Sequence, residues 1–217
     1  MTVEEYSSDD IDNLVNKIII QSTKQNRIII AISGVPGSGK TTVTSKIYDK
    51  LSKSVSVKIL QQDGFHYYLK ELHQMPNVEE ALERRGAPFT FNVDKLLSVV
   101  KAVKQGDRVS LPTFDHKLKD PVEDQVTIGD EKVIILEGNY FNLNLPKWKD
   151  INSYIDENWF VSTTVSVAKK RLIQRHLDAG ISRNVEEATK RVETNDLVNG
   201  QFIIQNQIKQ PNVIIHN

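Results

Sequence analysis

One segment combines three glycines with a lysine and a threonine at the spacing G-x-x-x-x-G-K-[ST]. An apolar run precedes this segment and a helical pattern follows it, which is the context that the spacing requires. Glycine lets backbone N–H groups turn toward phosphate oxygens, and the positive end of the helix favours the same anions. Lys40 is expected to reach the β- and γ-phosphates of a nucleotide, and the Thr41 hydroxyl is expected to bind Mg²⁺. The expected nucleotide-binding residues are Gly34, Val35, Pro36, Gly37, Ser38, Gly39, Lys40, Thr41 and Thr42.

Two acidic residues follow other apolar runs. Asp63 comes shortly after "SVKIL", and Glu137 lies at the end of "VIILEG". The carboxyl ends of parallel strands open onto one edge of a sheet, so both carboxylates are expected to flank the phosphates. Asp63 is placed to accept the proton of an acceptor hydroxyl, and Glu137 is placed to hold Mg²⁺ through water. The alternatives are that Asp63 caps a turn with Gly64, and that Glu137 marks a strand end that has reached solvent.

Two arginines stand four positions apart in the helical pattern of residues 166–179. Arg171 and Arg175 therefore share one helix face and can converge on the phosphate that is transferred. The alternative is an ordinary solvated helix face.

Residues 64–130 contain polar side chains suited to a small acceptor molecule. Arg84 and Arg85 suit an anionic or carboxylated acceptor, and Asp115 suits sugar hydroxyls, with His116 beside it. The alternative is that these side chains brace the segment against the sheet.

The elements that must position these residues alternate along the chain. Short apolar runs at 27–33, 56–60, 132–138, 158–162 and 212–216 predict five buried parallel strands. Helical patterns lie at 9–25, 41–52, 92–104, 166–179 and 185–207. This alternation predicts an α/β fold in which helices flank a five-stranded parallel sheet. Residues 64–130 fit the alternation poorly and are expected to form an irregular excursion from a single domain spanning residues 1–217.

Composition excludes several classes of function. Lys plus Arg and Asp plus Glu both total 28 among 217 residues, so no basic field favours nucleic acid or anionic lipid. The absence of cysteine excludes disulfides, thiolate metal sites and a cysteine nucleophile. The sequence shows neither a secretory signal nor an apolar run of membrane length. A soluble, cytoplasmic protein is therefore expected.

The motifs together resemble the P-loop small-molecule kinases that include phosphoribulokinase, uridine kinase and bacterial-type pantothenate kinase. The likeness extends from residue 27 to about residue 204, and it is most specific for uridine-kinase-like proteins with "DGFH" and "RRGAP". The residues that carry it are "GVPGSGKTT", "DGFHYY", "RRGAPFTF", "PTFDHKLKDP", "ILEGNYF", "RLIQRHLDAGIS" and "NDLVNGQF".

The resemblance implies a three-layer P-loop fold in which Asp63 is the catalytic base and Glu137 helps to hold Mg²⁺. It also implies that residues 166–200 form a lid and nucleotide-base region, in which the lid segment carries Arg171, Arg175 and His176.

The sequence also departs from the family's pattern. Uridine kinases carry Ser-Phe-Tyr after the catalytic Asp, whereas this chain has Gly64-Phe65-His66, and His66 joins the expected substrate-binding residues. Asn92 stands where an Asp is expected. Both departures bear on the choice of acceptor and leave the kinase chemistry intact.

The expected function is an ATP- and Mg²⁺-dependent kinase that phosphorylates a hydroxyl of a small metabolite, with uridine or a similar nucleoside as the leading acceptor. Pantothenate, a sugar or a sugar phosphate are the alternatives, and the sequence does not determine the oligomeric state. A switch or assembly ATPase is the rival from another class. The sequence lacks the N-K-x-D, D-x-x-G and Ser-Gly-Gly signatures of such proteins. The intact Lys40, Thr41, Asp63 and Glu137 argue against an idle nucleotide-binding module.

Overall fold

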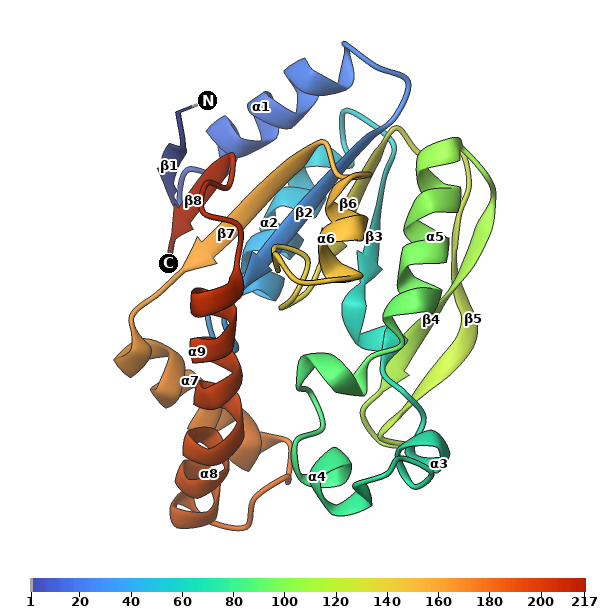
Figure 1. Cartoon of the computed structure of the whole chain (residues 1–217). Coiled ribbons are helices and arrows are strands. Elements are labelled where there is room, and N and C mark those ends of the chain that lie inside the picture. The colour runs from blue at the N-terminus through green and yellow to red at the C-terminus, as the bar shows by residue number, and fades with distance from the viewer. Residues whose placement is uncertain (1) are drawn as a thin grey trace.

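The computed structural model describes residues 2–217 of the chain. Across this range six strands form one parallel sheet in the order β1-β8-β7-β2-β6-β3, and two further strands, β4 and β5, pair antiparallel (Figure 1). The strands are β1 Glu4–Ser7, β2 Ile28–Gly34, β3 Val57–Gln61, β4 Val109–Asp115, β5 Asp120–Ile128, β6 Val133–Glu137, β7 Glu157–Ser162 and β8 Val213–His216. The predicted α/β class with a parallel central sheet is confirmed.

Helices cover both faces of this sheet and extend beyond its carboxyl edge. The α-helices are α1 Ile11–Ser22, α2 Lys40–Leu51, α3 Leu69–Leu72, α4 Val78–Glu83, α5 Val93–Gln105, α6 Trp148–Asn152, α7 Val165–Asp178, α8 Val185–Arg191 and α9 Leu197–Asn206. Two 3₁₀ segments, η1 Gln62–Phe65 and η2 Pro88–Thr90, and one π-helical segment, η3 Val192–Asp196, complete the elements. Helices α3, α4, α7 and α8 lie beyond the carboxyl ends of the strands (Figure 1).

The hydrophobic core has two layers, one on each face of the sheet. On one face α1 and α2 pack with residues such as Leu14 and Ile47, and on the other α5 and α6 pack with residues such as Leu96 and Trp148. The central strand β2 is buried along its whole length, as its continuous apolar run predicts. This burial fixes the point from which the phosphate-binding segment leaves the sheet.

The prediction of five strands was wrong, because the sheet has a sixth strand, β1, at its edge. Strand β1 has the sequence EEYS, and none of its four side chains is buried. It pairs with the neighbouring strand β8, from Glu4 opposite Val213 to Ser7 opposite His216. A short edge strand held by backbone hydrogen bonds carries no apolar pattern, so hydrophobic periodicity could not reveal it.

Residues 64–130 are more regular than expected. They hold α3, α4, η2 and α5, followed by the antiparallel pair β4 and β5. Pro112 in β4 coincides with a register irregularity between Leu111 and Thr113, and Pro121 lies in β5. Prolines and a charged tip break the alternation that normally reveals a hairpin, which explains why this pair of strands was missed.

Short polar side chains start several helices. Asn92 precedes α5, and its side chain accepts a hydrogen bond from the backbone N–H of Lys95 at 2.9 Å. Asn is a favoured residue at this capping position. The Asn92 side chain, which departs from the family's pattern, therefore has a structural partner in this chain. Within residues 2–217, the helices are all too short or too polar to cross a membrane.

Candidate active site

The segment between β2 and α2 forms a cradle in which glycine is required. Gly37 and Gly39 have φ angles of 77° and 90°, in the left-handed region that side chains disfavour. A Cβ atom at Gly34 would lie 2.5 Å from the carbonyl oxygen of Val161, so a side chain there would collide with backbone. The chain can therefore turn closely above β7 and present its N–H groups at the start of α2.

Lys40 begins α2 and points into the cradle. Only 8% of the residue is exposed, and its Nζ donates a hydrogen bond to the carbonyl of Val35 at 3.1 Å. Burial lowers the pKa of Lys40 to about 8, although the negative charges of Glu137 and Asp63 act in the opposite direction. A buried cation with two nearby carboxylates is suited to neutralising phosphate oxygens.

Glu137 lies beside the cradle because β6 is paired with both β2 and β3. Glu137 stands opposite Ile32 on β2 and opposite Gln61 on β3. The Thr41 hydroxyl donates a hydrogen bond to Glu137 Oε1 at 3.3 Å. Burial raises the pKa of Glu137, and the charge of Lys40 opposes this effect.

The oxygens of Thr41 and Glu137 fit Mg²⁺, which prefers a few protein oxygens together with substrate phosphates. No group of three or more His, Asp or Glu side chains suited to a metal ion occurs among residues 2–217. A metal at this place would therefore need ligands from the nucleotide as well as from the protein.

Asp63 lies in η1, directly after the carboxyl end of β3, and is exposed. The turn that follows is closed by the Asp63 carbonyl, which accepts the backbone N–H of His66 at 3.3 Å. Within the described range, no hydrogen bond or ion pair engages the Asp63 carboxylate. The negative charge of Asp63 opposes the lowering of the Lys40 pKa by burial and adds to the raising of the Glu137 pKa by burial, so this carboxylate lies within electrostatic range of both groups.

The two arginines of α7 approach the cradle at different points. Arg171 Nη1 lies 3.5 Å from the carbonyl of Gly37 and 3.4 Å from that of Ser38. Burial lowers the pKa of Lys40 and raises that of Glu137, and the positive charge of Arg175 is the smallest influence on each, so Arg175 lies within electrostatic range of both. Arg171 therefore lies against the phosphate-binding segment, and the convergence of both arginines on a transferred phosphate stays a prediction. His176, on the same helix, is buried against Asp196 at 2.8 Å.

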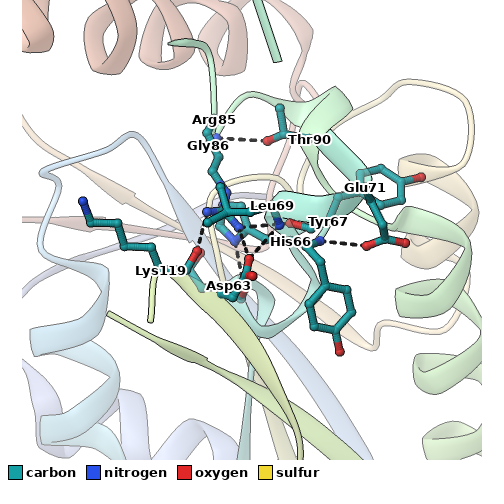
Figure 2. A network of polar contacts seen from close by, with 11 residues as sticks. Asp63, His66, Tyr67, Leu69, Glu71, Arg85, Gly86, Thr90 and Lys119 are labelled. Atoms are coloured by element: carbon teal, nitrogen blue, oxygen red, sulfur yellow. Dashed lines mark hydrogen bonds and ion pairs between the residues drawn. The ribbon is translucent and has the colours of Figure 1, made fainter. Parts of the chain in front are cut away.

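We call the region of Asp63, His66, Arg85 and the β4–β5 hairpin the acceptor side of the candidate site. In this region His66 and Arg85 lie close to Asp63 (Figure 2). The His66 ring centroid is 3.9 Å from that of Phe91 and 5.0 Å from that of Phe114. Its Nδ1 lies 2.8 Å from the Asp63 carbonyl oxygen. Burial lowers the pKa of His66, while the nearby charge of Asp63 acts in the opposite direction.

Arg85 is held by protein acceptors. Its guanidinium donates to the Tyr67 carbonyl at 3.0 Å, to Asp120 Oδ1 at 2.9 Å and to the Lys119 carbonyl. It also lies over the ring of Phe114, 5.4 Å from the ring centroid. These contacts join the segment after α4 to the hairpin. Arg85 thereby helps to position the aromatic wall beside Asp63, which consists of His66, Phe91 and Phe114.

The other predicted acceptor residues lie further out or turn elsewhere. Asp115, at the tip of the hairpin, accepts backbone N–H groups of Lys117 at 2.7 Å and Leu118 at 3.0 Å. His116 is exposed beside it. Arg84 instead donates to Asn195 in η3 and to Asn199 in α9.

Sequence reasoning missed the polar residues that support this site. The Gln62 side chain accepts the backbone N–H of Tyr140 at 2.9 Å, and the Tyr140 hydroxyl donates to the Gly86 carbonyl at 2.5 Å. The Asn217 side chain donates to the Ser38 carbonyl at 2.6 Å. Gln62 and Tyr140 are neighbours of Asp63 and Glu137 in the sequence, but only the pairing of β3 with β6 brings them together.

Comparison with known proteins places this geometry in a family. The Phosphoribulokinase / Uridine kinase family matches residues 29–217. A Schizosaccharomyces pombe protein named "Putative uridine kinase C227.14" is 37% identical over 94% of this chain and 89% of its own length.

Solved structures agree. The structure described as "putative fructose transport system kinase" from Silicibacter sp. TM1040 has a TM-score of 0.83 and 28% identity, covering 94% of this chain and 98% of that chain. D-glycerate 3-kinase from Cryptococcus neoformans shares the fold, with a TM-score of 0.68 and 12% identity, covering 95% of both chains. This chain is a P-loop kinase that belongs to the phosphoribulokinase / uridine kinase family.

Proposed function

We propose that this chain is an ATP- and Mg²⁺-dependent kinase that phosphorylates a hydroxyl group of uridine or another nucleoside. The observation that carries the proposal is the Asp63 carboxylate, which has no hydrogen-bond partner within residues 2–217 and lies near Lys40 and Glu137. A phosphate site with an unengaged carboxylate beside it suits transfer to an acceptor, because a hydroxyl nucleophile must lose its proton.

In the proposed reaction, Asp63 accepts the proton of the acceptor hydroxyl. The acceptor oxygen forms a bond to the γ-phosphorus while the bond from that phosphorus to the β–γ bridging oxygen breaks, and ADP leaves. Lys40 and Arg175 neutralise charge on the transferred group, and Arg171 holds the cradle from outside. Thr41 and Glu137 would hold Mg²⁺, which supplies further charge neutralisation when it is bound.

The acceptor is proposed to bind between Asp63 and the hairpin. His66, Arg85, Asp115 and His116 surround this region from two segments, and Phe114 provides an apolar surface between the two histidines. Residues 166–200 are proposed to act as the lid. The relative named as a uridine kinase supports a nucleoside acceptor, which binds through a planar base and ribose hydroxyls.

A sugar acceptor is the second candidate. It is favoured by the likeness to the structure described as a fructose transport system kinase, which covers 94% of this chain. Asp115 could accept hydrogen bonds from sugar hydroxyls in either case. A cytoplasmic location and a single domain over residues 1–217 complete the proposal.

The test is a transfer assay with labelled ATP and separate pools of nucleosides, sugars, pantothenate and glycerate. We expect the label to appear on a nucleoside, and we expect Mg²⁺ removal to abolish transfer. Label on a sugar alone would favour the second candidate. If ATP is hydrolysed at the same rate with and without each pool, and no acceptor becomes labelled, the kinase proposal is contradicted and a nucleotide-hydrolysing ATPase is favoured.

A further inference from the structure

The guanidinium of Arg84 is bound by two asparagines that lie more than 100 positions away. Arg84 Nε donates to Asn195 Oδ1 at 3.1 Å, and Nη2 donates to Asn199 Oδ1 at 2.8 Å. Asn199 Nδ2 also donates to Asn195 Oδ1 at 3.2 Å. Both asparagines are buried, with 6% and 3% of their surface exposed. The planar guanidinium donates from two of its nitrogens, one to each asparagine, and we call these three side chains the clasp.

The clasp holds a turn that also contacts the strand ends of the active site. Asn195 Nδ2 donates to the Arg85 carbonyl at 3.3 Å, and the Tyr140 hydroxyl donates to the Gly86 carbonyl at 2.5 Å. Tyr140 in turn is bound by Gln62, the residue before Asp63. The turn at residues 84–86 therefore joins the end of α4 to the loops after β3 and β6.

On its other side the clasp reaches the helix that carries the arginines. Asn195 and Asp196 are consecutive residues in the π-helical segment η3. Asn195 faces Arg84, while Asp196 Oδ2 lies 2.8 Å from Nε2 of the buried His176 on α7. A π-helical turn widens the helix locally, and such turns recur at functional sites. In this chain Asn195 and Asp196 are neighbours in η3, yet Asn195 contacts the turn at residues 84–86 and Asp196 contacts α7.

We propose that Arg84 is a positioning residue for phosphoryl transfer, an inference that rests on the proposed kinase function. By binding Asn195 and Asn199, Arg84 fixes the acceptor-side segment relative to α7, so that Asp63 and Arg175 face one reacting centre. This role differs from the substrate contact predicted for Arg84 from the sequence. It fits the use of two of the three guanidinium nitrogens by buried protein oxygens.

The first experiment compares Arg84→Gln with Arg108→Gln, which alters an exposed arginine directly before β4. We expect Arg84→Gln to lower kcat for transfer by about 10- to 100-fold, because small displacements of reacting groups cost this much. Its affinity for ATP should stay within about threefold of the wild type. The control should match the wild type in both measurements. A change confined to the acceptor KM, at unchanged kcat, would instead indicate direct substrate contact and overturn the proposal.

A double-mutant cycle separates positioning from direct contact. Asn199→Ala should lower kcat as Arg84→Gln does, and the double variant should be little worse than the poorer single variant, since both break one clasp. Asn199→Asp keeps an oxygen acceptor for Arg84 and should lose less activity than Asn199→Ala. If the losses in kcat of the two single variants add in the double variant, Arg84 and Asn199 act independently, which would contradict the clasp.

Hydrogen exchange tests the clasp without any acceptor, so a failure of the kinase proposal can be told apart from a failure of this inference. In Arg84→Gln we expect faster amide exchange both at residues 78–92 and at residues 192–200, with α2 unchanged. Faster exchange at residues 78–92 alone would show that Arg84 stabilises only its own segment and would overturn the inference. If the wild type transfers phosphate to no acceptor, the proposed function fails, and the positioning role fails with it even where the exchange result shows that the clasp exists.

Discussion

The nucleotide side and the acceptor side of the candidate active site are built in different ways. The nucleotide side is formed by the segment that follows the fully buried strand β2, and it depends on backbone geometry at Gly34, Gly37 and Gly39. The acceptor side depends on side-chain contacts between distant segments, such as those of Arg84 with Asn195. A backbone cradle requires a fixed local sequence, whereas side-chain contacts can be exchanged in many ways.

This difference explains why the chemistry can be inferred more securely than the acceptor. Among the residues proposed to act on phosphate, Glu137 ends the buried strand β6 and Lys40 begins the helix that follows β2, so neither can shift without disturbing the sheet. The residues proposed to bind the acceptor lie on the hairpin, on the turn after α4 and at His66 after η1, where substitutions alter shape without removing the core. We expect nucleotide-side variants to affect transfer to every acceptor and acceptor-side variants to affect the choice between acceptors.

The largest effect is expected from Lys40→Ala. Removing a single cation at a transferring phosphoryl group costs about 10³- to 10⁵-fold in kcat. The measurement is steady-state transfer with any accepted substrate, and the control is Lys46→Ala, which removes an exposed lysine of the same helix. Turnover near the wild-type rate in Lys40→Ala would show that the cradle is not the site of transfer.

A smaller but more diagnostic loss is expected from Asp63→Asn. Losing a general base typically costs about 10²- to 10⁴-fold, while ATP affinity should survive because the base touches the acceptor. Single-turnover transfer and nucleotide affinity should be measured on the same preparation, with Glu137→Gln as the comparison that weakens Mg²⁺-dependent ATP binding.

The outcomes for Asp63→Asn separate three roles. If Asp63 is the base, the variant loses transfer but keeps its nucleotide affinity. If Asp63 is a metal ligand, the variant loses Mg²⁺ affinity and ATP affinity together. A turn cap loses little, since Asn also caps turns. Unchanged transfer would refute the assignment of Asp63 as the base.

The two arginines of α7 give a finer test of the nucleotide side. Arg175→Ala should lower kcat on the order of 10²-fold and raise the KM for ATP less, because its charge acts near Lys40 and Glu137. Arg171→Ala should follow the same pattern with a smaller loss, since Arg171 donates to the backbone carbonyls of Gly37 and Ser38 at 3.5 and 3.4 Å. Lys170→Ala, which alters an exposed residue of the same helix, is the matched control. Equal behaviour of all three variants would favour a solvated helix face.

The sequence predicted the elements whose residues share a local pattern. Five of the six sheet strands and the phosphate-binding segment were recognised because apolar runs and glycine spacing are local signals. Strand β1 was missed because its side chains are not buried, and the hairpin was missed because prolines and charges break its alternation.

The supporting contacts of the site could not be predicted for a related reason. Arg84 and Arg85 are adjacent and chemically identical, yet one binds Asn195 and Asn199 while the other binds Asp120. Only the arrangement of distant segments decides which way each guanidinium points. The bracing alternative considered from the sequence describes these contacts, although their effect on substrate choice stays a prediction.

The smallest effect concerns the stability of the acceptor side at low pH. Desolvation of the half-buried His66 beside Phe91 and Phe114 lowers its pKa below the ordinary value of 6.5. The unfolded chain therefore takes up a proton at His66 at a higher pH than the folded chain does. As the pH falls below about 6.5, the free energy of unfolding should decrease, and this loss should end once the pH lies below the folded pKa.

His66→Phe keeps an aromatic ring without the titrating group. Denaturant unfolding at pH 8, where His66 is neutral in both states, gives the reference difference between variant and wild type. We expect this difference to shift in favour of His66→Phe as the pH is lowered from 6.5 to 5. A difference that stays constant over this range would show that solvent reaches His66 and that the aromatic wall beside Asp63 is open.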